Sequence, residues 1–412
     1  MKHVLFIIAI VISNSIYAND FNKYFENATL RIDYLFSGDV NEQMISVSEY
    51  VKLPEWAGRR IHLNEAPIEY NCEIVMKDKT NTQTLYRNTF SCFFTDWLLE
   101  EEAKHIKRSI ECVQLLPFPK DTVIITVYMR DSYHKEMAHL THMVNPKDEL
   151  IRKISPTQAT TPFYYLMKNG PSSECIDLVV MAEGYNKKQM EQFRKDAATG
   201  IESIFNYVPF CHYKDRFNVI VVESESRDSA VSIPHDNKWY DTALGAHFDT
   251  FHEPRLLFTE KFKQIHNLLE GIPYEHIIIL ANTDTYGGGG VYNTYMLTTA
   301  HHPGFKPVIV HEFGHSFGAL TDEYAYSDEP SSTYPYEVEP YERNITTKVD
   351  FASKWEDMMN DPEVSLFEGG GYSNKGIYRC AQTCRMRDNV APTFCKVCQR
   401  AIEQMIKFYT EE

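Results

Sequence analysis

The sequence has little positive charge. Its 412 residues include 41 Lys and Arg against 57 Asp and Glu, which gives a formal net charge of −16. Binding to a phosphate backbone requires clustered positive charge, so we expect no nucleic-acid partner. Beyond the first eighteen residues no apolar run approaches the roughly 20 residues that cross a bilayer, so we expect no membrane span in the mature chain. Internal repeats and low-complexity tracts are also absent.

The N-terminus has the pattern of a secretory signal peptide. Lys2 and His3 precede an apolar run over residues 4–12, and the small Ala18 closes a more polar stretch. The apolar run is too short to serve as a retained membrane anchor. We therefore expect residues 1–18 to be removed and the protein to be exported, to the periplasm or the extracellular space. The sequence does not predict its oligomeric state.

Residues 19–160 have the alternating pattern of β-strands. Residues 30–35 and 122–128 alternate apolar and polar positions and are rich in β-branched and aromatic side chains. Residues 96–107 are the one amphipathic interruption and predict a short helix. No catalytic spacing occurs in this region. We expect an N-terminal β-sandwich-like domain that ends in the Pro, Ser and Thr-rich stretch before residue 161.

Residues 161–412 have a different pattern. Nearly continuous apolar runs predict strands buried on both faces, and they occupy residues 176–181, 217–222 and 276–280. Residues 187–205 read as a helix between the first two runs. Strands that alternate with helices predict an α/β domain, so the expected fold class is a two-domain α+β arrangement.

The string FKPVIVHEFGHSFGALTDEY at residues 305–324 contains an HExxH motif. On a helix His311 and His315 share one face, so both imidazoles can bind one metal ion. Glu312 lies about 100° further round the helix, where its carboxylate can take a proton from a water on that ion. A buried helix whose histidines merely pack is the alternative, but burying these polar groups without partners would cost several kcal/mol.

A catalytic zinc takes three protein ligands and leaves one position open, so a third ligand is required. Gly318 and Ala319 allow the helix to end soon after His315, and the chain then offers Asp322 or Glu323. We expect Asp322 to be the ligand, with Glu323 as the alternative. Nitrogen and oxygen ligands suit zinc better than calcium or magnesium, so we expect one catalytic Zn²⁺.

The string HEFGHSFGALTDEY resembles the zinc signature of the IgA-specific metallopeptidases, or igalysins, a branch of the metzincin zinc peptidases. The resemblance extends over nearly the whole mature chain. In the second region it includes DLVVMAEGY (177–185), DTALGAHFD (241–249), YGGGGVYN (286–293), EGGGYSNKGIYR (368–379) and CRMR (384–387). In the first region LRIDYLFSGD, EWAGRR and PFPK are similar to the family's N-terminal β domain.

The resemblance implies a metzincin-like catalytic domain and further roles. Metzincins commonly place the third ligand at the position that is Thr321 here, whereas the igalysin-like pattern has an aspartate one place later and supports Asp322. Met386 would form the methionine turn beneath the metal; an ordinary core methionine is the alternative. The glycines at 287–290 would let an extended peptide pair along the cleft edge, or would simply form a loop.

Four of the nine cysteines gather near the C-terminus, and they are Cys380, Cys384, Cys395 and Cys398. Such spacing fits a structural zinc site, but export favours disulfides, which would brace the turn at Met386. The other five, which we expect to be mostly buried inert thiols, are Cys72, Cys92, Cys112, Cys175 and Cys211.

Together these patterns predict a secreted zinc endopeptidase that acts on a protein or peptide substrate. Zinc on His311, His315 and Asp322 would bind the attacking water, and Glu312 would activate it. The sequence does not decide which tyrosine assists among Tyr324, Tyr372 and Tyr378, nor whether IgA or another protein is cleaved. Two alternatives stay open: an adhesin with an idle peptidase fold, and a zinc amidase acting on cell-wall peptides.

Overall fold

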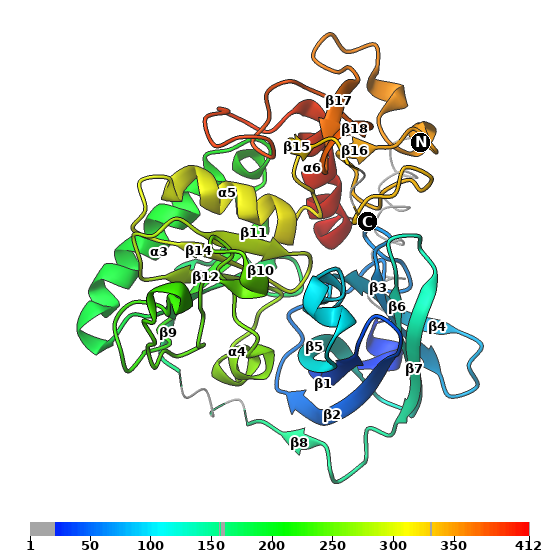
Figure 1. The fold of residues 1–412 in the computed structure, drawn as a ribbon. Coiled ribbons are helices and arrows are strands. Elements are labelled where there is room, and N and C mark those ends of the chain that lie inside the picture. The colour runs from blue at the N-terminus through cyan, green and yellow to red at the C-terminus, as the bar shows by residue number, and fades with distance from the viewer. Residues whose placement is uncertain (1–20, 156, 158–160, 330–331, 412) are drawn as a thin grey trace, which may run out of the picture.

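The structure is a computed structural model that describes residues 21–155, 157, 161–329 and 332–411. The expected signal peptide, residues 1–18, lies outside these residues. Figure 1 shows a β-rich N-terminal part and a larger part in which helices pack on a central sheet. In the described residues no helix combines the length and the hydropathy that crossing a membrane requires.

The N-terminal domain consists of two four-stranded sheets, with strand orders β5-β1-β2-β8 and β4-β3-β6-β7. Its strands are β1 (Phe25–Gly38), β2 (Gln43–Leu53), β3 (Cys72–Asp78), β4 (Thr84–Phe90), β5 (Arg108–Pro119), β6 (Val123–Arg130), β7 (Glu136–Val144) and β8 (Arg152–Lys153). Alternate residues of β6 are buried, as its period-two pattern predicts. The helix expected over residues 96–107 is wrong in its bounds, because the chain forms α2 (Phe93–Trp97) and a separate 3₁₀ turn at Glu101–Lys104.

The second domain is built on a mixed six-stranded sheet of order β13-β14-β12-β10-β11-β9. Its strands are β9 (Phe163–Met167), β10 (Ile176–Glu183), β11 (Phe217–Val222), β12 (His276–Ala281), β13 (Gly288–Val291) and β14 (Tyr295–Thr299). The four inner strands are parallel, and the two edge strands β9 and β13 run antiparallel to their neighbours. The three apolar runs of the sequence are the strands β10, β11 and β12, which confirms that prediction.

Both faces of this sheet are covered, which explains why its strands are apolar throughout. Leu178 and Val180 of β10 pack in the same core as three helices, α3 (Met190–Phe205), α5 (Phe305–Ser316) and α6 (Lys396–Thr410). Val179 and Met181 face the opposite way and share a core with α4 (Phe262–Leu268) and the N-terminal domain. The hydrophobic core is therefore continuous between the two domains.

A small sheet follows α5 and lies beside α6 (Figure 1). Its central strand β18 (Tyr372–Arg379) pairs with β15 (Ala325–Ser327), β16 (Ile345–Thr346) and β17 (Phe367–Gly370). Because β15 and β18 are parallel neighbours, residues just past the HExxH helix lie beside Tyr372.

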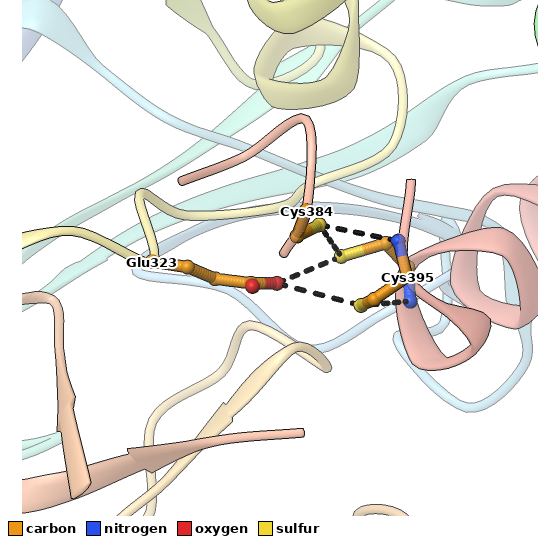
Figure 2. A group of neighbouring side chains, drawn as sticks. Glu323, Cys384 and Cys395 are labelled. Atoms are coloured by element: carbon orange, nitrogen blue, oxygen red, sulfur yellow. Dashed lines mark hydrogen bonds between the residues drawn. The ribbon is translucent and has the colours of Figure 1, made fainter. Parts of the chain in front are cut away.

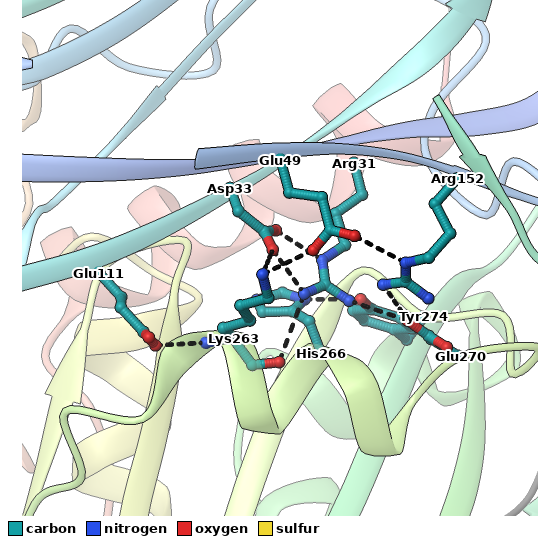
Figure 3. A network of polar contacts seen from close by, with 9 residues as sticks. All are labelled: Arg31, Asp33, Glu49, Glu111, Arg152, Lys263, His266, Glu270 and Tyr274. Atoms are coloured by element: carbon teal, nitrogen blue, oxygen red, sulfur yellow. Dashed lines mark hydrogen bonds and ion pairs between the residues drawn. The ribbon is translucent and has the colours of Figure 1, made fainter. Parts of the chain in front are cut away.

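A buried ionic network joins the two domains where β1 meets α4 (Figure 3). Arg31 of β1 is fully buried and forms two bonds to Asp33, at 2.7 and 2.9 Å. Its guanidinium also lies 3.5 Å from Glu270 of the second domain. In the opposite direction, Lys263 of α4 forms an ion pair with the N-terminal domain, and its Nζ lies 2.6 Å from Glu49 of β2. Each charge therefore has an opposite charge beside it.

We predict that Arg31→Met lowers the free energy of unfolding by about 3 kcal/mol, because Asp33 would stay buried without its main partner. Chemical denaturation followed by tryptophan fluorescence measures the change. The control is Arg227→Met, which removes an ion pair whose side chains are 82% and 65% exposed and should leave stability nearly unchanged. Equal effects of the two substitutions would contradict a structural role for the network.

Candidate metal centre

Helix α5 carries the HExxH motif and is held rigidly between α3 and the sheet. Ile309 and Val310 are fully buried, and Ile309 packs so closely on Gly200 of α3 that a Cβ there would come within 2.6 Å of it. On the opposite side Gly290 of β13 lies against the helix backbone, where a Cβ would come within 2.4 Å of the Glu312 carbonyl oxygen. This close packing fixes the positions of His311 and His315.

The chain turns back immediately after α5. Ala319 adopts a positive φ of 49°, and its N–H donates to the His315 carbonyl at 3.1 Å. Gly318 is needed for a different reason, because a Cβ there would meet the Gly314 carbonyl oxygen at 2.7 Å. The turn brings Asp322 back beside the two histidines.

Three ligand atoms converge at this place. His311 Nε2 and His315 Nε2 lie 3.1 Å apart, and Asp322 Oδ1 lies 3.0 and 3.4 Å from them. Zinc bonds of 2.0–2.2 Å in a tetrahedral arrangement would separate such atoms by about 3.3 Å. The spacing and the two-nitrogen, one-oxygen donor set therefore fit a zinc ion.

Hydrogen bonds on the far side of each ring show that lone pairs face this point. His311 Nδ1 lies 2.9 Å from the Arg385 carbonyl oxygen, and His315 Nδ1 lies 2.6 Å from that of Leu320. Since a carbonyl only accepts, each Nδ1 must carry a proton and donate, which leaves the Nε2 of each neutral ring as an acceptor. Asp322 Oδ1, in a residue only 5% exposed, faces the same two Nε2 atoms.

The electrostatics of the centre also favour a cation. Burial opposes the charged form of His311, but the hydrogen bond and charge of Asp322 prevail and raise the His311 pKa to about 9. Burial likewise opposes ionisation of Asp322, yet the two imidazoles hold its pKa well below the usual range. A proton, or a metal ion in its place, is therefore strongly attracted to the point where the three groups meet.

Glu312 lies beside this point, with a carboxylate oxygen within 4.8 Å of the ligand nitrogens of both histidines. Desolvation raises its pKa above the ordinary range, whereas the two histidines and Arg255 act in the opposite direction. A carboxylate with a raised pKa is a better proton acceptor at neutral pH than an ordinary one.

Asp322 and its neighbour Glu323 point in different directions. Asp322 Oδ2 accepts a hydrogen bond from the Tyr372 hydroxyl at 2.8 Å, which orients the carboxylate toward the histidines. Glu323 instead reaches into a group of cysteines (Figure 2). Of the three tyrosines considered from the sequence, Tyr324 and Tyr372 line the same cavity as the histidines, whereas Tyr378 lies outside it beside Glu368.

The centre forms the floor of a cleft of about 820 Å³ between the two domains. The second domain contributes the histidines, the glycines of β13 and Arg255, while the N-terminal domain contributes α2 and residues 130–134. The domains also meet through aromatic rings that line the cleft. The ring centroid of Phe93 of α2 lies 4.7 Å from that of Phe251 and 5.2 Å from that of Phe258. Both domains therefore line the cleft.

Met386 packs against helix α5 at Gly314. It is fully buried, and its sulfur would lie 2.7 Å from a Cβ added to Gly314, between the two histidines. The Met386 carbonyl accepts a hydrogen bond of 2.8 Å from the Glu323 N–H. The segment that carries Met386 thus touches both the helix and the turn behind Asp322.

The disulfides expected from export are not found: all nine cysteines, each within the described residues, are free thiols. The physical reason at the C-terminal group is that the sulfurs gather around Glu323, with Cys384 Sγ and Cys398 Sγ 3.7 Å apart, far beyond the roughly 2.05 Å of a disulfide. Of the five other cysteines four are buried as expected, and Cys211 is exposed.

Sequence patterns did not predict some of the groups that form the centre. Arg255 belongs to no motif, and it lines the cleft from the loop before α4. The carbonyl oxygens of Leu320 and Arg385 leave no side-chain signature at all. The hydrogen bond from Tyr372 to Asp322 depends on the pairing of β15 with β18, which no local pattern predicts.

We predict that Asp322→Asn weakens zinc binding by about 100-fold or more, since it replaces an anionic ligand by a neutral amide. Competition with a chromophoric chelator measures the affinity. The matched control is Glu253→Gln, which neutralises an exposed acid in the same cleft and should leave the affinity unchanged. An unchanged affinity of Asp322→Asn would rule Asp322 out as the third ligand.

Two protein-family models match the chain. A family model described as IgA Peptidase M64 matches residues 165–366, which include α5 and Asp322. A second model, described as Peptidase M64 N-terminus, matches residues 20–141. No curated protein matched the chain. The two family models together cover most of the sequence, and the chain therefore belongs to the M64 family of IgA peptidases.

Proposed function

We propose that this protein is a zinc-dependent endopeptidase that hydrolyses peptide bonds of protein substrates. Membership of the M64 family supports a peptidase function, and the metal centre supplies the chemistry. The observation that carries the proposal is the convergence of two imidazole nitrogens and one carboxylate oxygen within 3.0–3.4 Å, with Glu312 beside them on the floor of a cleft. Met386 beneath α5 also supports a metzincin-like arrangement.

In the proposed mechanism His311, His315 and Asp322 hold the ion. Zinc, when bound, supplies a Lewis acid that makes water more acidic and polarises a carbonyl group. Glu312 accepts the proton of the attacking water and then passes it to the nitrogen of the departing amine. Tyr372 keeps Asp322 oriented, and the carbonyls of Leu320 and Arg385 keep the imidazoles in the ligating tautomer.

The substrate chain would lie along β13, the edge strand of the six-stranded sheet. One side of β13 pairs with β14, and its glycines line the cleft beside the histidines. An edge strand leaves one row of peptide groups free to pair with an extended peptide. The glycines allow β13 to pack closely on its neighbours. A Cβ at Gly289, for example, would overlap the ring of Phe258 at 1.9 Å.

Two alternatives share parts of this structure. An adhesin with an idle peptidase fold would bind its target through the N-terminal sheets and would have no need of Glu312. A zinc amidase acting on cell-wall peptides would use the same centre. Digestion of casein beside a cell-wall peptide preparation, each with and without a chelator, separates the three functions, because only the endopeptidase cleaves casein in a chelator-sensitive way.

We predict that Glu312→Gln lowers kcat/KM for peptide hydrolysis by at least about 100-fold while zinc stays bound, because the amide cannot accept the proton of water. Cleavage of casein followed by mass spectrometry, together with the zinc content of the same sample, measures both effects. Glu253→Gln serves again as the control within the cleft. The mechanism is wrong if Glu312→Gln with bound zinc cleaves as fast as the parent.

We also propose that the protein is exported and that residues 1–18 are removed. The support is the charged start, the short apolar run and Ala18. N-terminal sequencing of the protein from the culture medium or periplasm of the producing cell should find Asn19 as the first residue. Recovery of the intact N-terminus from the cytosol would contradict export.

A further inference from the structure

A second group of buried side chains lies behind the metal centre and takes no part in the proposed hydrolysis. Its ligand atoms all lie within 4.8 Å of one another, and its members are Glu323, Cys384, Cys395 and Cys398. Figure 2 shows the Glu323 carboxylate pointing toward the sulfur atoms. We propose that these four side chains bind a second, structural zinc ion, independent of the one at the histidines.

The separations within the group are those of metal ligands rather than of disulfides. Cys384 Sγ lies 3.7 Å from Cys398 Sγ, and Cys395 Sγ lies 3.6 Å from Glu323 Oε1. A tetrahedral zinc ion with Zn–S bonds of about 2.3 Å would place two sulfurs about 3.8 Å apart and a sulfur and an oxygen about 3.5 Å apart. The contact from Cys398 Sγ to Glu323 Oε1 is shorter, at 3.0 Å.

The carboxylate gives an independent reason to expect a cation. Glu323 is fully buried, and its Oε2 has no hydrogen-bond partner. Its Oε1 receives only the Asn344 amide, at 3.1 Å, and the thiols. Among the described residues no Lys or Arg forms an ion pair with it. A buried carboxylate without a counter-charge is costly, and a bound metal ion removes that cost.

The chemistry of the donors selects the metal. Three thiolates form a soft ligand set that excludes calcium and magnesium and favours zinc. The four side chains are buried and supply four donors, which closes a tetrahedral site and leaves no position for water or substrate. Cys380 is also buried and lies beside Cys395, so it is the alternative to Glu323 as the fourth ligand.

The position of the group explains what the ion would do. Glu323 follows the catalytic ligand Asp322, and Cys384 precedes Arg385, whose carbonyl orients His311. Cys395 caps the N-terminus of α6, where its sulfur accepts the N–H of Cys398. One ion would therefore tie together the turn after α5, the Met386 segment and α6, which are the three segments that form the base of the catalytic centre.

Cobalt substitution can test the second site without reference to activity. A cobalt ion bound by thiolates shows an intense sulfur-to-metal charge-transfer band in the near ultraviolet, which a site with only nitrogen and oxygen ligands does not. We expect the full chain to bind about two zinc ions, and its cobalt form to show this band. The variant His311→Ala/His315→Ala should lose one ion and keep the band.

Substitutions within the group identify its ligands. Cys395→Ser/Cys398→Ser should lose the band and one zinc ion, and the isosteric Glu323→Gln should bind this ion at least about 10-fold more weakly. The matched controls are Cys380→Ser, a buried neighbour outside the group, and the exposed Cys211→Ser, which should both keep the band. Circular dichroism establishes that each variant is folded.

Three results would overturn the proposal. The first is a disulfide among these cysteines in the mass of the unreduced native protein, and the second is a cobalt form without the band. The third is loss of the ion in Cys380→Ser with an unchanged affinity in Glu323→Gln, which would remove Glu323 from the ligand set. A protein that shows the band but cleaves no peptide would instead refute the proposed function and leave the second site standing.

Discussion

The metal centre depends on two hydrogen bonds from imidazole Nδ1 atoms to main-chain carbonyls. They fix the tautomer and the rotation of His311 and His315, so that both Nε2 atoms and Asp322 Oδ1 face one common point. One acceptor, Leu320, belongs to the turn that follows the helix, and the other, Arg385, lies far along the sequence. Much of the second domain can be understood as the support that brings these two carbonyls to the helix.

Close packing around α5 holds these segments in place. Close contacts at Gly200 and Gly290 hold α5 between α3 and β13, and Met386 fills the space beneath Gly314. The Glu323 N–H bonds to the Met386 carbonyl, so the turn that presents Asp322 is joined to the segment that orients His311. Adjacent residues there face opposite ways, with Asp322 toward the cleft and Glu323 toward the cysteines.

The N-terminal domain forms part of the cleft that contains the metal centre. Its core merges with one face of the central sheet, and its α2 and residues 130–134 form a wall of the cleft. The buried Arg31 network and the ring stack at Phe93 hold the two domains in one orientation. A substrate long enough to lie along β13 would therefore meet side chains from both domains.

The sequence by itself determined the parts that follow from local periodicity and composition. Apolar runs identified β10, β11 and β12, alternation identified the N-terminal strands, and the spacing of four residues placed His311 and His315 on one helical face. It favoured Asp322 over Glu323 as the third ligand, and it favoured disulfides for cysteines that the structure shows as thiols.

Only the tertiary structure shows where these side chains point, because each orientation depends on where distant segments meet. The turn at Ala319 and the hydroxyl of Tyr372 turn Asp322 toward the histidines, whereas Glu323 turns to sulfurs that come from a later segment and from α6. The glycines of β13 leave no room for a side chain, because a Cβ at Gly289 would overlap Phe258 and one at Gly290 would overlap the backbone of α5. Periodicity specifies which face a side chain occupies, but the partner on that face is set by packing between elements far apart in the chain.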